Sequence, residues 1–261
     1  MSKSGLLDRW LAPAPDPARV AWLRGVTYAH RGLHGPDAAE NSPSAFAAAI
    51  AAGLGIECDV RPSADGRAMV FHDRALDRLT GESGEVAGRT AGDLARIELS
   101  GARDTIPRLG DLLTQIGGRV PLLIELKSER ERPVALLCRA VAEDLAGYAG
   151  PHAAMSFDPR VGRWFARHAP ETVRGLVVSE SGARNRRGAL ARRLSLWRAK
   201  PDFLAYDVRD LRSAFAAAQR ARGLPLLTWT VVNRIQLERA QRRTDGYIAE
   251  GEGLASALAK P

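Results

Sequence analysis

Eight short apolar runs, rich in β-forming residues, recur along the 261-residue chain with helix-forming stretches between them. This alternation is typical of βαβ units, in which parallel strands are joined by crossing helices. Eight such units close into a barrel, a fold that commonly takes ~250 residues as one domain. The sequence therefore predicts the α/β class and a TIM (β/α)8 barrel. The expected strands are residues 26–30, 55–59, 122–126, 153–157, 175–178, 203–206, 226–230 and 246–249.

A ninth apolar run, residues 70–72, follows the second predicted strand closely. A parallel crossover needs a dozen or more residues, so we expect an antiparallel β-hairpin that rises from the barrel rim. Its turn is expected at Asp65-Gly66, a pair that tolerates positive φ angles. With that turn, His72 would lie opposite Asp59. The glycine- and threonine-rich segment 79–105 is expected to be a small loop insertion after this strand, acting as a lid or on the substrate side.

Two helices have clear signals. Ser42 is the expected N-cap of the first helix, with Pro43 at its first position and Gly53 beyond its end. A second helix is expected at 133–145, with an apolar stripe of Val134, Leu137, Val141 and Leu145. We expect two parts in the chain, an N-terminal arm at 1–25 and the barrel domain at 26–256.

The N-terminal arm carries Leu6, Leu7, Trp10 and Leu11 but is interrupted by charged residues and prolines. It lacks the apolar stretch of a secretory signal, and no apolar run in the chain is long enough to span a membrane. Either the arm packs against the barrel bottom, or it makes a weak peripheral contact with a membrane. Two cysteines are too few for a disulfide framework, so we expect a reducing, cytoplasmic location.

Arginine gives the chain its basic character. The formal net charge is +8, and only four of the 38 basic residues are lysines. Such a surplus suits an anionic substrate or an anionic membrane surface. The densest arginine run, residues 184–198, has no nucleic-acid-binding motif near it, so we interpret it as a solvated helix face and expect no nucleic-acid partner.

Acidic side chains stand at the ends of two predicted strands. Glu57 and Asp59 lie two residues apart and so point to the same side, while Cys58 points toward the helices. The same spacing places Glu125 beside Lys127. Because the active sites of (β/α)8 barrels lie at the carboxyl ends of the strands, we expect the three carboxylates to converge.

Three converging carboxylates would repel one another, and a bound divalent cation is the simplest compensation. Oxygen ligands favour Mg²⁺ or Ca²⁺ over zinc, and the sequence leaves both open. The alternative is that the carboxylates form internal salt bridges with Arg31, Arg61 and Lys127.

The remaining candidate residues suit chemistry on a phosphate ester. His30 and His72 are candidates for general acid and base, whereas His34, His152 and His168 receive no role. Arg31 and Lys127 could bind phosphoryl oxygens, and Asn41 could donate to the phosphate. Trp229 packs either on the alcohol part of a substrate or in the barrel core. The residues expected to bind substrate are Arg31, Glu40, Asn41, Lys127 and Trp229.

Motifs spread over residues 26–250 resemble those of the glycerophosphodiester phosphodiesterase family, in its cytoplasmic bacterial form. They include Ala29-His30-Arg31-Gly32, Glu40-Asn41-Ser42, Glu57-x-Asp59, Asp65-Gly66, His72-Asp73, Arg78-Leu79-Thr80-Gly81, Ile106-Pro107-x-Leu109, Ile124-Glu125-Leu126-Lys127 and Trp229-Thr230-Val231. The chain departs from the family pattern near its end, at Val232-Asn233 and at Tyr247-Ile248-Ala249-Glu250. These departures bear on alcohol specificity and on the contacts of the eighth strand.

The resemblance implies a TIM barrel that hydrolyses glycerophosphodiesters to sn-glycerol 3-phosphate and an alcohol. It also implies that Glu57, Asp59 and Glu125 bind the cation, that His30 and His72 act as acid and base, and that Arg31 and Lys127 contact phosphate. Two alternatives remain open. One is lysophospholipase D-like hydrolysis of membrane lysophospholipids, and the other is a barrel that binds phosphoesters without catalysis.

Overall fold

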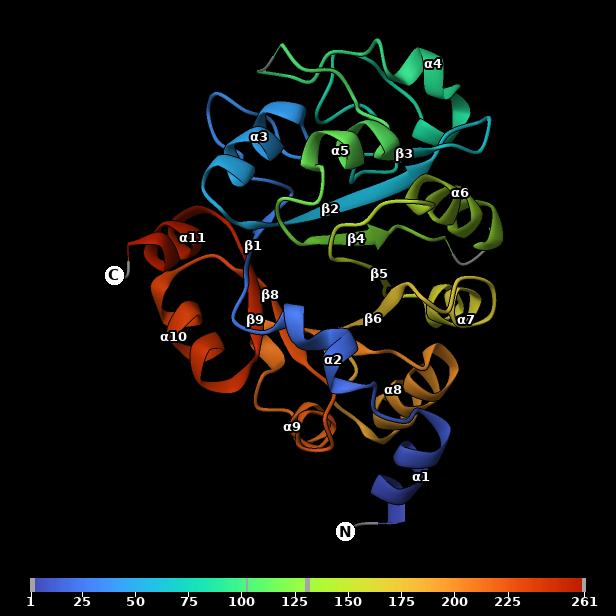
Figure 1. Ribbon diagram of the computed structural model, residues 1–261, viewed down its shortest axis with the longest axis vertical. Helices are drawn as coiled ribbons and strands as arrows, with labels where there is room; N and C mark the ends of the chain where they lie inside the picture. Colours follow the sequence, from blue (N-terminus) through green and yellow to red (C-terminus); the bar gives the residue numbers. More distant parts are fainter. Residues whose placement is uncertain (1–2, 102, 130–131, 260–261) are drawn as a thin grey trace. The chain divides into compact units, whose positions relative to one another are not determined.

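Strands and helices alternate along the computed structural model, which describes residues 3–101, 103–129 and 132–259 (Figure 1). One sheet has the strand order β1-β9-β8-β7-β6-β5-β4-β2-β3, with an additional pairing of β1 with β2. This order, with eight parallel strands and helices between them, is that of a TIM (β/α)8 barrel, which confirms the predicted fold. All eight expected strands are found: β1 Thr27–His30, β2 Gly55–Pro62, β4 Leu122–Leu126, β5 His152–Ser156, β6 Val173–Val178, β7 Phe203–Asp207, β8 Leu226–Val231 and β9 Gly246–Ala249.

The chain divides into two compact units. Tyr28–His152 form one, here called the β1–β4 unit, and Met1–Thr27 with Ala153–Pro261 form the other, the β5–β9 unit. Each unit has its own set of helices. Those of the β1–β4 unit are α3 Pro43–Ala51, α4 Ala91–Leu94, α5 Leu109–Ile116, α6 Ala135–Leu145 and the 3-10 turn η2 Val86–Gly88.

The two helices predicted in the β1–β4 unit are confirmed. The Ser42 side chain accepts a hydrogen bond from the Ala45 amide at the start of α3, and Pro43 is the first helical residue. Gly53 beyond the helix has a φ of 65°. In α6, the stripe residues Leu137, Val141 and Leu145 are buried, although the helix begins two residues later than expected.

The hairpin formed by β2 and β3 (Ala68–Val70) is antiparallel, as predicted, but its register is not the predicted one. Val60 pairs with Val70, and the Phe71 amide donates to the Asp59 carbonyl at 3.0 Å. Phe71, and not His72, therefore lies opposite Asp59. The reason is the turn, in which Ser63 N donates to Arg67 O and leaves three residues at the tip, with Gly66 at a φ of 76°.

The predicted insertion after the hairpin is present, but segment 79–105 is more ordered than a plain loop. It contains η2 and α4, and its apolar side chains bury a small core against β3. Burial of these apolar side chains stabilises the folded segment. The core residues are Met69, Phe71, Leu76, Val86, Ala91, Leu94, Ile97, Leu99 and Ile106.

The β5–β9 unit is built from parallel strand pairs. Gly175 of β6 pairs with Phe203 of β7, and Leu204 of β7 pairs with Leu226 of β8. A Cβ atom at Gly175 would lie 2.4 Å from the Phe203 ring, so only glycine fits this close packing. The helical segments of the unit are α1 Lys3–Leu11, α2 Pro17–Val20, η1 Ala21–Leu23, α7 Pro159–His168, α8 Arg186–Ala199, η3 Val208–Asp210, α9 Ala214–Ala221, α10 Arg234–Arg243 and α11 Gly251–Leu258.

The N-terminal segment packs within the β5–β9 unit. Asp8 of α1 is buried and accepts hydrogen bonds from Trp197 of α8 and Gln219 of α9, each at 2.9 Å. Residues 1–2 lie outside the described residues, and the boundary between arm and barrel at residue 25 stays a prediction.

Within the described ranges, every helix is too short or too polar to cross a bilayer. Cys58 and Cys138 are both buried free thiols.

Candidate active site

Three buried carboxylates meet within the β1–β4 unit, where the middle of β2 pairs with the carboxyl end of β4. Glu57 and Asp59 lie on β2, and Asp59 pairs in register with Glu125 of the parallel strand β4. The three side chains are 2 %, 1 % and 8 % exposed. Each offers an oxygen atom, and the three oxygens lie within 4.8 Å of one another. The structure thus brings together the three residues that the sequence predicted to converge.

Two cations stand among these carboxylates. Lys127 Nζ lies 2.6 Å from Glu125 Oε1 and 2.9 Å from Asp59 Oδ1, and Arg31 Nε lies 3.1 Å from Asp59 Oδ2. The internal salt bridges that sequence reasoning held as an alternative are therefore present for Arg31 and Lys127. Arg61 instead pairs with Glu129, at 3.6 Å. Three negative charges against two positive ones leave the cluster short of positive charge.

This shortage is reflected in the pKa values. Burial raises the pKa of Glu57 well above its ordinary value, and the neighbouring charges of Asp59 and Glu125 add to the effect. Burial likewise raises the pKa of Glu125, although Lys127 opposes the shift. For Asp59, burial acts upward, but the charges of Lys127 and Arg31 outweigh it and the pKa is lowered. Asp59 is thus the carboxylate that its protein neighbours compensate best.

The donor set fits a divalent metal ion. All three candidate ligands are carboxylates, the type that Mg²⁺ and Ca²⁺ prefer, and their oxygens are close enough to share one ion. A positive ion would remove the repulsion that raises the pKa of Glu57. The site is therefore chemically suited to a divalent cation.

The loop after β1 places several polar groups beside the carboxylates. Arg31 and Asn41 both adopt positive φ values, 56° and 57°, and the Asn41 amide donates to the Arg31 carbonyl. Between them, a Cβ atom at Gly32 would lie 2.9 Å from Ala45 of α3, so the loop approaches the helix too closely for a larger residue. The Asn41 side chain donates to Asp59 Oδ2 at 3.0 Å and accepts from the Asp59 amide at 3.2 Å. Asn41 thus orients Asp59.

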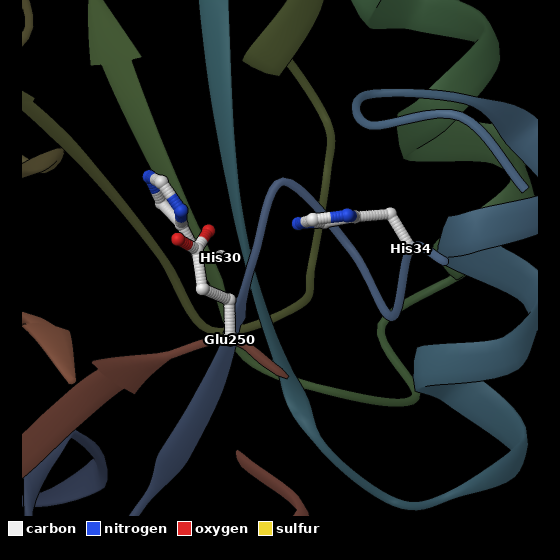
Figure 2. Close-up of side chains that lie close together, drawn as sticks. All are labelled: His30, His34 and Glu250. Atoms are coloured by element: carbon white, nitrogen blue, oxygen red, sulfur yellow. The ribbon is translucent and has the colours of Figure 1, made fainter. Parts of the chain in front are cut away.

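His30, the last residue of β1, pairs in register with Glu57, and its Nε2 atom lies 4.0 Å from Glu57 Oε2. His34 follows in the same loop, and a ring nitrogen of each histidine lies within 4.8 Å of the other. Figure 2 shows the His34 ring directed toward the side on which His30 lies. His34 was not among the residues predicted to act in the site, although it follows His30 by four residues, just past the end of a strand.

His72 follows β3 and stands at the beginning of a polar chain. Its Nδ1 atom lies 2.6 Å from Asp73 Oδ1, and Arg78 joins Asp73 to Glu40, with contacts of 3.1 Å and 2.7 Å through its Nη2 atom. Glu40 in turn accepts from Arg31 Nη1 at 2.7 Å. A continuous series of contacts therefore connects the His72 ring with Arg31, which also pairs with Asp59.

The charges along this chain shift several pKa values. Hydrogen bonds from Arg78, with a contribution from His72, lower the pKa of Asp73 to about 2. Burial, with the positive charge of Lys127, lowers the pKa of His72, although Asp59 acts in the opposite direction. At neutral pH, the Asp73 carboxylate is ionised and the His72 ring is neutral. Asp73 and Arg78 were not predicted as site residues, although both belong to the motifs His72-Asp73 and Arg78-Leu79-Thr80-Gly81.

Trp229, the last of the predicted substrate-binding residues, lies in the β5–β9 unit. Its indole nitrogen donates to the Ala205 carbonyl at 3.0 Å, and its ring meets the half-exposed Phe157 edge to face at 5.3 Å. These contacts agree with a packing role. Its contact with the alcohol part of a substrate stays a prediction.

The family model described as "Glycerophosphoryl diester phosphodiesterase family" matches residues 30–249, which include every candidate site residue. The chain belongs to the glycerophosphoryl diester phosphodiesterase family. This confirms the resemblance that the motifs indicated.

Curated members of the family are similar to parts of the chain. It is 37 % identical over 121 residues to "Probable glycerophosphodiester phosphodiesterase 2" of Mycobacterium tuberculosis. The aligned residues make up 46 % of each chain. It is also 37 % identical over 108 residues to the glycerophosphodiester phosphodiesterase of Bacillus altitudinis. This alignment covers 38 % of the present chain and 43 % of the relative. The matched part thus spans less than half the length of these relatives.

Several solved structures have the same fold as this family member. A phosphodiesterase of Oleispira antarctica, in complex with the product sn-glycerol-3-phosphate, has a TM-score of 0.76 at 22 % identity, over 90 % of this chain and 96 % of that one. The glycerophosphodiester phosphodiesterase of Thermotoga maritima has a TM-score of 0.72 at 24 % identity, over 89 % and 97 % of the two chains. At these identities, the likeness establishes the barrel fold.

Proposed function

We propose that the protein is a metal-dependent phosphodiesterase that hydrolyses glycerophosphodiesters to sn-glycerol 3-phosphate and an alcohol. The observation that carries the proposal is the cluster of Glu57, Asp59 and Glu125, three buried carboxylate oxygens within 4.8 Å of one another, with His30 beside it. Family membership supports the reaction class. The substrate class rests on the product, sn-glycerol-3-phosphate, that the structural neighbour from Oleispira antarctica holds.

Glu57, Asp59 and Glu125 would hold the divalent cation, Mg²⁺ or Ca²⁺. When bound, such an ion supplies positive charge that stabilises the phosphoryl oxygens. Lys127 and Arg31 add their own positive charges at the same place, and both are fixed by their ion pairs with the carboxylates. Preorganised charge of this kind is a large contribution to catalysis, because it costs no reorganisation during the reaction.

His72 is the proposed general base. The ionised Asp73 accepts the hydrogen of Nδ1, which leaves Nε2 unprotonated and able to take a proton from the nucleophile. The lowered pKa of His72 keeps the ring in this neutral form. Asp73 thus sets the tautomer, and Arg78 holds Asp73 in place.

His30 is the proposed general acid, which would donate a proton to the leaving alkoxide. Its Nε2 atom lies 4.0 Å from Glu57 Oε2, so the ring stands beside the carboxylate cluster. Glu40 and Asn41 are assigned to the substrate-binding edge of the site because they hold Arg31 and Asp59, respectively. Trp229 is proposed to pack on the alcohol portion of the substrate.

A metal-by-substrate activity panel on chelator-treated protein tests the proposal. We expect no turnover of glycerophosphocholine without metal and recovery with Mg²⁺ or Ca²⁺. Faster hydrolysis of lysophosphatidylcholine, with release of choline, would favour the lysophospholipase D-like alternative. Binding of the phosphoester without turnover under any metal would replace the proposal by a non-catalytic barrel. Detection of a cyclic phosphate product by ³¹P NMR would identify a substrate hydroxyl, and not water, as the nucleophile.

A further inference from the structure

Two helices of the β5–β9 unit expose large apolar side chains that the proposed active site does not use. Leu6, Leu7 and Trp10 on α1, and Leu190 and Leu194 on α8, are between 48 % and 79 % exposed. Single exposed leucines are ordinary, but several on two neighbouring helices, with a tryptophan among them, mark a surface that contacts something.

α1 is fixed to α8 by a buried acidic residue. Asp8 accepts a hydrogen bond from Trp197 Nε1 at 2.9 Å, and Arg193 Nε lies 3.8 Å from the same oxygen. Figure 1 shows α1 beside α8 at the N-terminal end of the chain. Because helical positions two residues apart lie on opposite sides, Leu6 and Trp10 point away from the side that Asp8 anchors.

The outer face of α8 combines apolar and basic side chains. Arg187, Leu190, Leu194 and Arg198 are exposed and follow one another at helical spacing, so they share a face. Leu190 and Leu194 each lie one turn from a residue that contacts Asp8, namely Arg193 and Trp197, so this face borders α1. Neither Arg187 nor Arg198 has an ion-pair partner within residues 3–101, 103–129 and 132–259.

We propose that α1 and α8 form a docking face for an anionic lipid bilayer. Tryptophan and leucine side chains suit the boundary between lipid headgroups and acyl chains, and the unpaired guanidinium groups match the negative phosphates of the lipids. The net charge of +8 adds a general attraction to such a surface. The α1/α8 face consists of Leu6, Leu7, Trp10, Arg187, Leu190, Leu194 and Arg198.

The same charges argue against a second copy of the chain as the occupant. A symmetric dimer through this face would bring the unpaired Arg187 and Arg198 of one copy toward those of the other. Like charges in an interface are destabilising. A bilayer containing anionic lipid supplies the opposite charge and an apolar phase together. The inference concerns this face alone and does not depend on the reaction at the candidate active site.

Vesicle flotation tests the inference directly. We expect the protein to float with vesicles of phosphatidylcholine and phosphatidylglycerol, to float poorly with phosphatidylcholine alone, and to dissociate as salt is raised. Replacing Trp10, Leu190 and Leu194 together by serine is expected to abolish flotation. The double variant Arg187→Gln/Arg198→Gln is expected to weaken it about fivefold per arginine.

Matched controls lie on other helices of the same unit. Ile235→Ser on α10 removes a side chain that is 72 % exposed, and Arg163→Gln/Arg167→Gln removes two exposed arginines of α7. Both controls are expected to float as the unaltered protein does. Equal flotation on neutral and anionic vesicles, or an equal loss in the controls, would overturn the inference. A dimer in sedimentation velocity that Leu194→Ser dissociates, without vesicle binding, would instead identify a second copy as the occupant.

Discussion

Lys127 Nζ lies 2.9 Å from Asp59 Oδ1, so a lysine stands inside the carboxylate cluster that is proposed to bind a cation. The pairing explains why the pKa of Asp59 is lowered despite burial, while burial raises the pKa of Glu57. One carboxylate thus stays ionised through protein charges, and the others depend on a further positive charge. Lys127 and a bound cation would therefore compensate the charge of the same carboxylates.

Replacing Lys127 by methionine is expected to raise the pKa of Asp59 and to strengthen cation binding, because a competing positive charge is removed. Turnover is expected to fall about 10²–10³-fold, because a preorganised charge near the phosphoryl group is lost. Calorimetric metal titration and steady-state kinetics measure the two effects. Lys200→Met, at an exposed lysine after α8, is the control. Cation affinity that falls in the Lys127 variant would contradict the competition.

His72→Gln is expected to lower kcat about 10²–10⁴-fold through loss of the general base. Because burial lowers the pKa of His72, the unprotonated ring predominates at neutral pH, and kcat/KM of the unaltered enzyme should rise with pH and level off below ~6.5. The variant should lack this acidic limb. Circular dichroism shows whether the fold is kept. An unchanged pH profile in the variant would remove His72 from the role of base.

Glu57→Gln is expected to stabilise the metal-free protein at neutral pH. The folded-state pKa of Glu57 is raised, so the folded protein holds a proton that the unfolded chain has released, and the free energy of unfolding decreases as the pH rises above the unfolded pKa of ~4.3. Glutamine removes this loss, and the gain should vanish below that pH. Thermal unfolding at several pH values measures it.

The same Glu57 variant should lose metal affinity. Divalent cation stabilises a protein that binds it only in the folded state, so the thermal shift on adding Mg²⁺ or Ca²⁺ should be smaller in Glu57→Gln than in the unaltered protein. Excess cation is expected to restore part of the activity. An equal thermal shift in both proteins would exclude Glu57 as a ligand.

Arg78→Ala is expected to reduce kcat about tenfold or more while leaving the fold intact, because Arg78 joins Asp73 to Glu40 and thereby orients His72. The pKa of Asp73 should rise from about 2 toward its ordinary value, since the Arg78 hydrogen bonds are its main cause. NMR titration of the carboxyl groups measures it. Arg74→Ala is a matched control. Arg74 is also an exposed arginine that follows β3, but it pairs with Glu85. Equal losses in both variants would contradict the positioning role.

Leu94→Ala tests the small core formed by segment 79–105. Leu94 is fully buried in this core, so its truncation should lower the free energy of unfolding by about 2–5 kcal/mol. Urea unfolding measures the change. Leu136→Ala, at an exposed leucine of α6, should change stability by less than about 0.5 kcal/mol. A small effect at Leu94 would mean that the segment packs loosely.

The barrel and the carboxylate cluster could be predicted from the order of the residues. Alternating strands and helices admit few arrangements, and side chains two apart on a strand must share a side, so Glu57, Asp59 and Glu125 could be assigned to one site from their spacing. The cap of α3 by Ser42 and the stripe of α6 also follow from local rules, because both depend on neighbours within a turn or two.

Features that depend on one residue of register, or on contacts between distant residues, could not be predicted in this way. A three-residue turn, in place of the expected two, put Phe71 and not His72 opposite Asp59. The contacts from His72 to Arg31 join residues up to 38 positions apart through side-chain rotamers, which the sequence does not encode locally. The ion pairs of Lys127 with two carboxylates on different strands arise in the same way, because electrostatic energy depends on distances that only the folded chain sets.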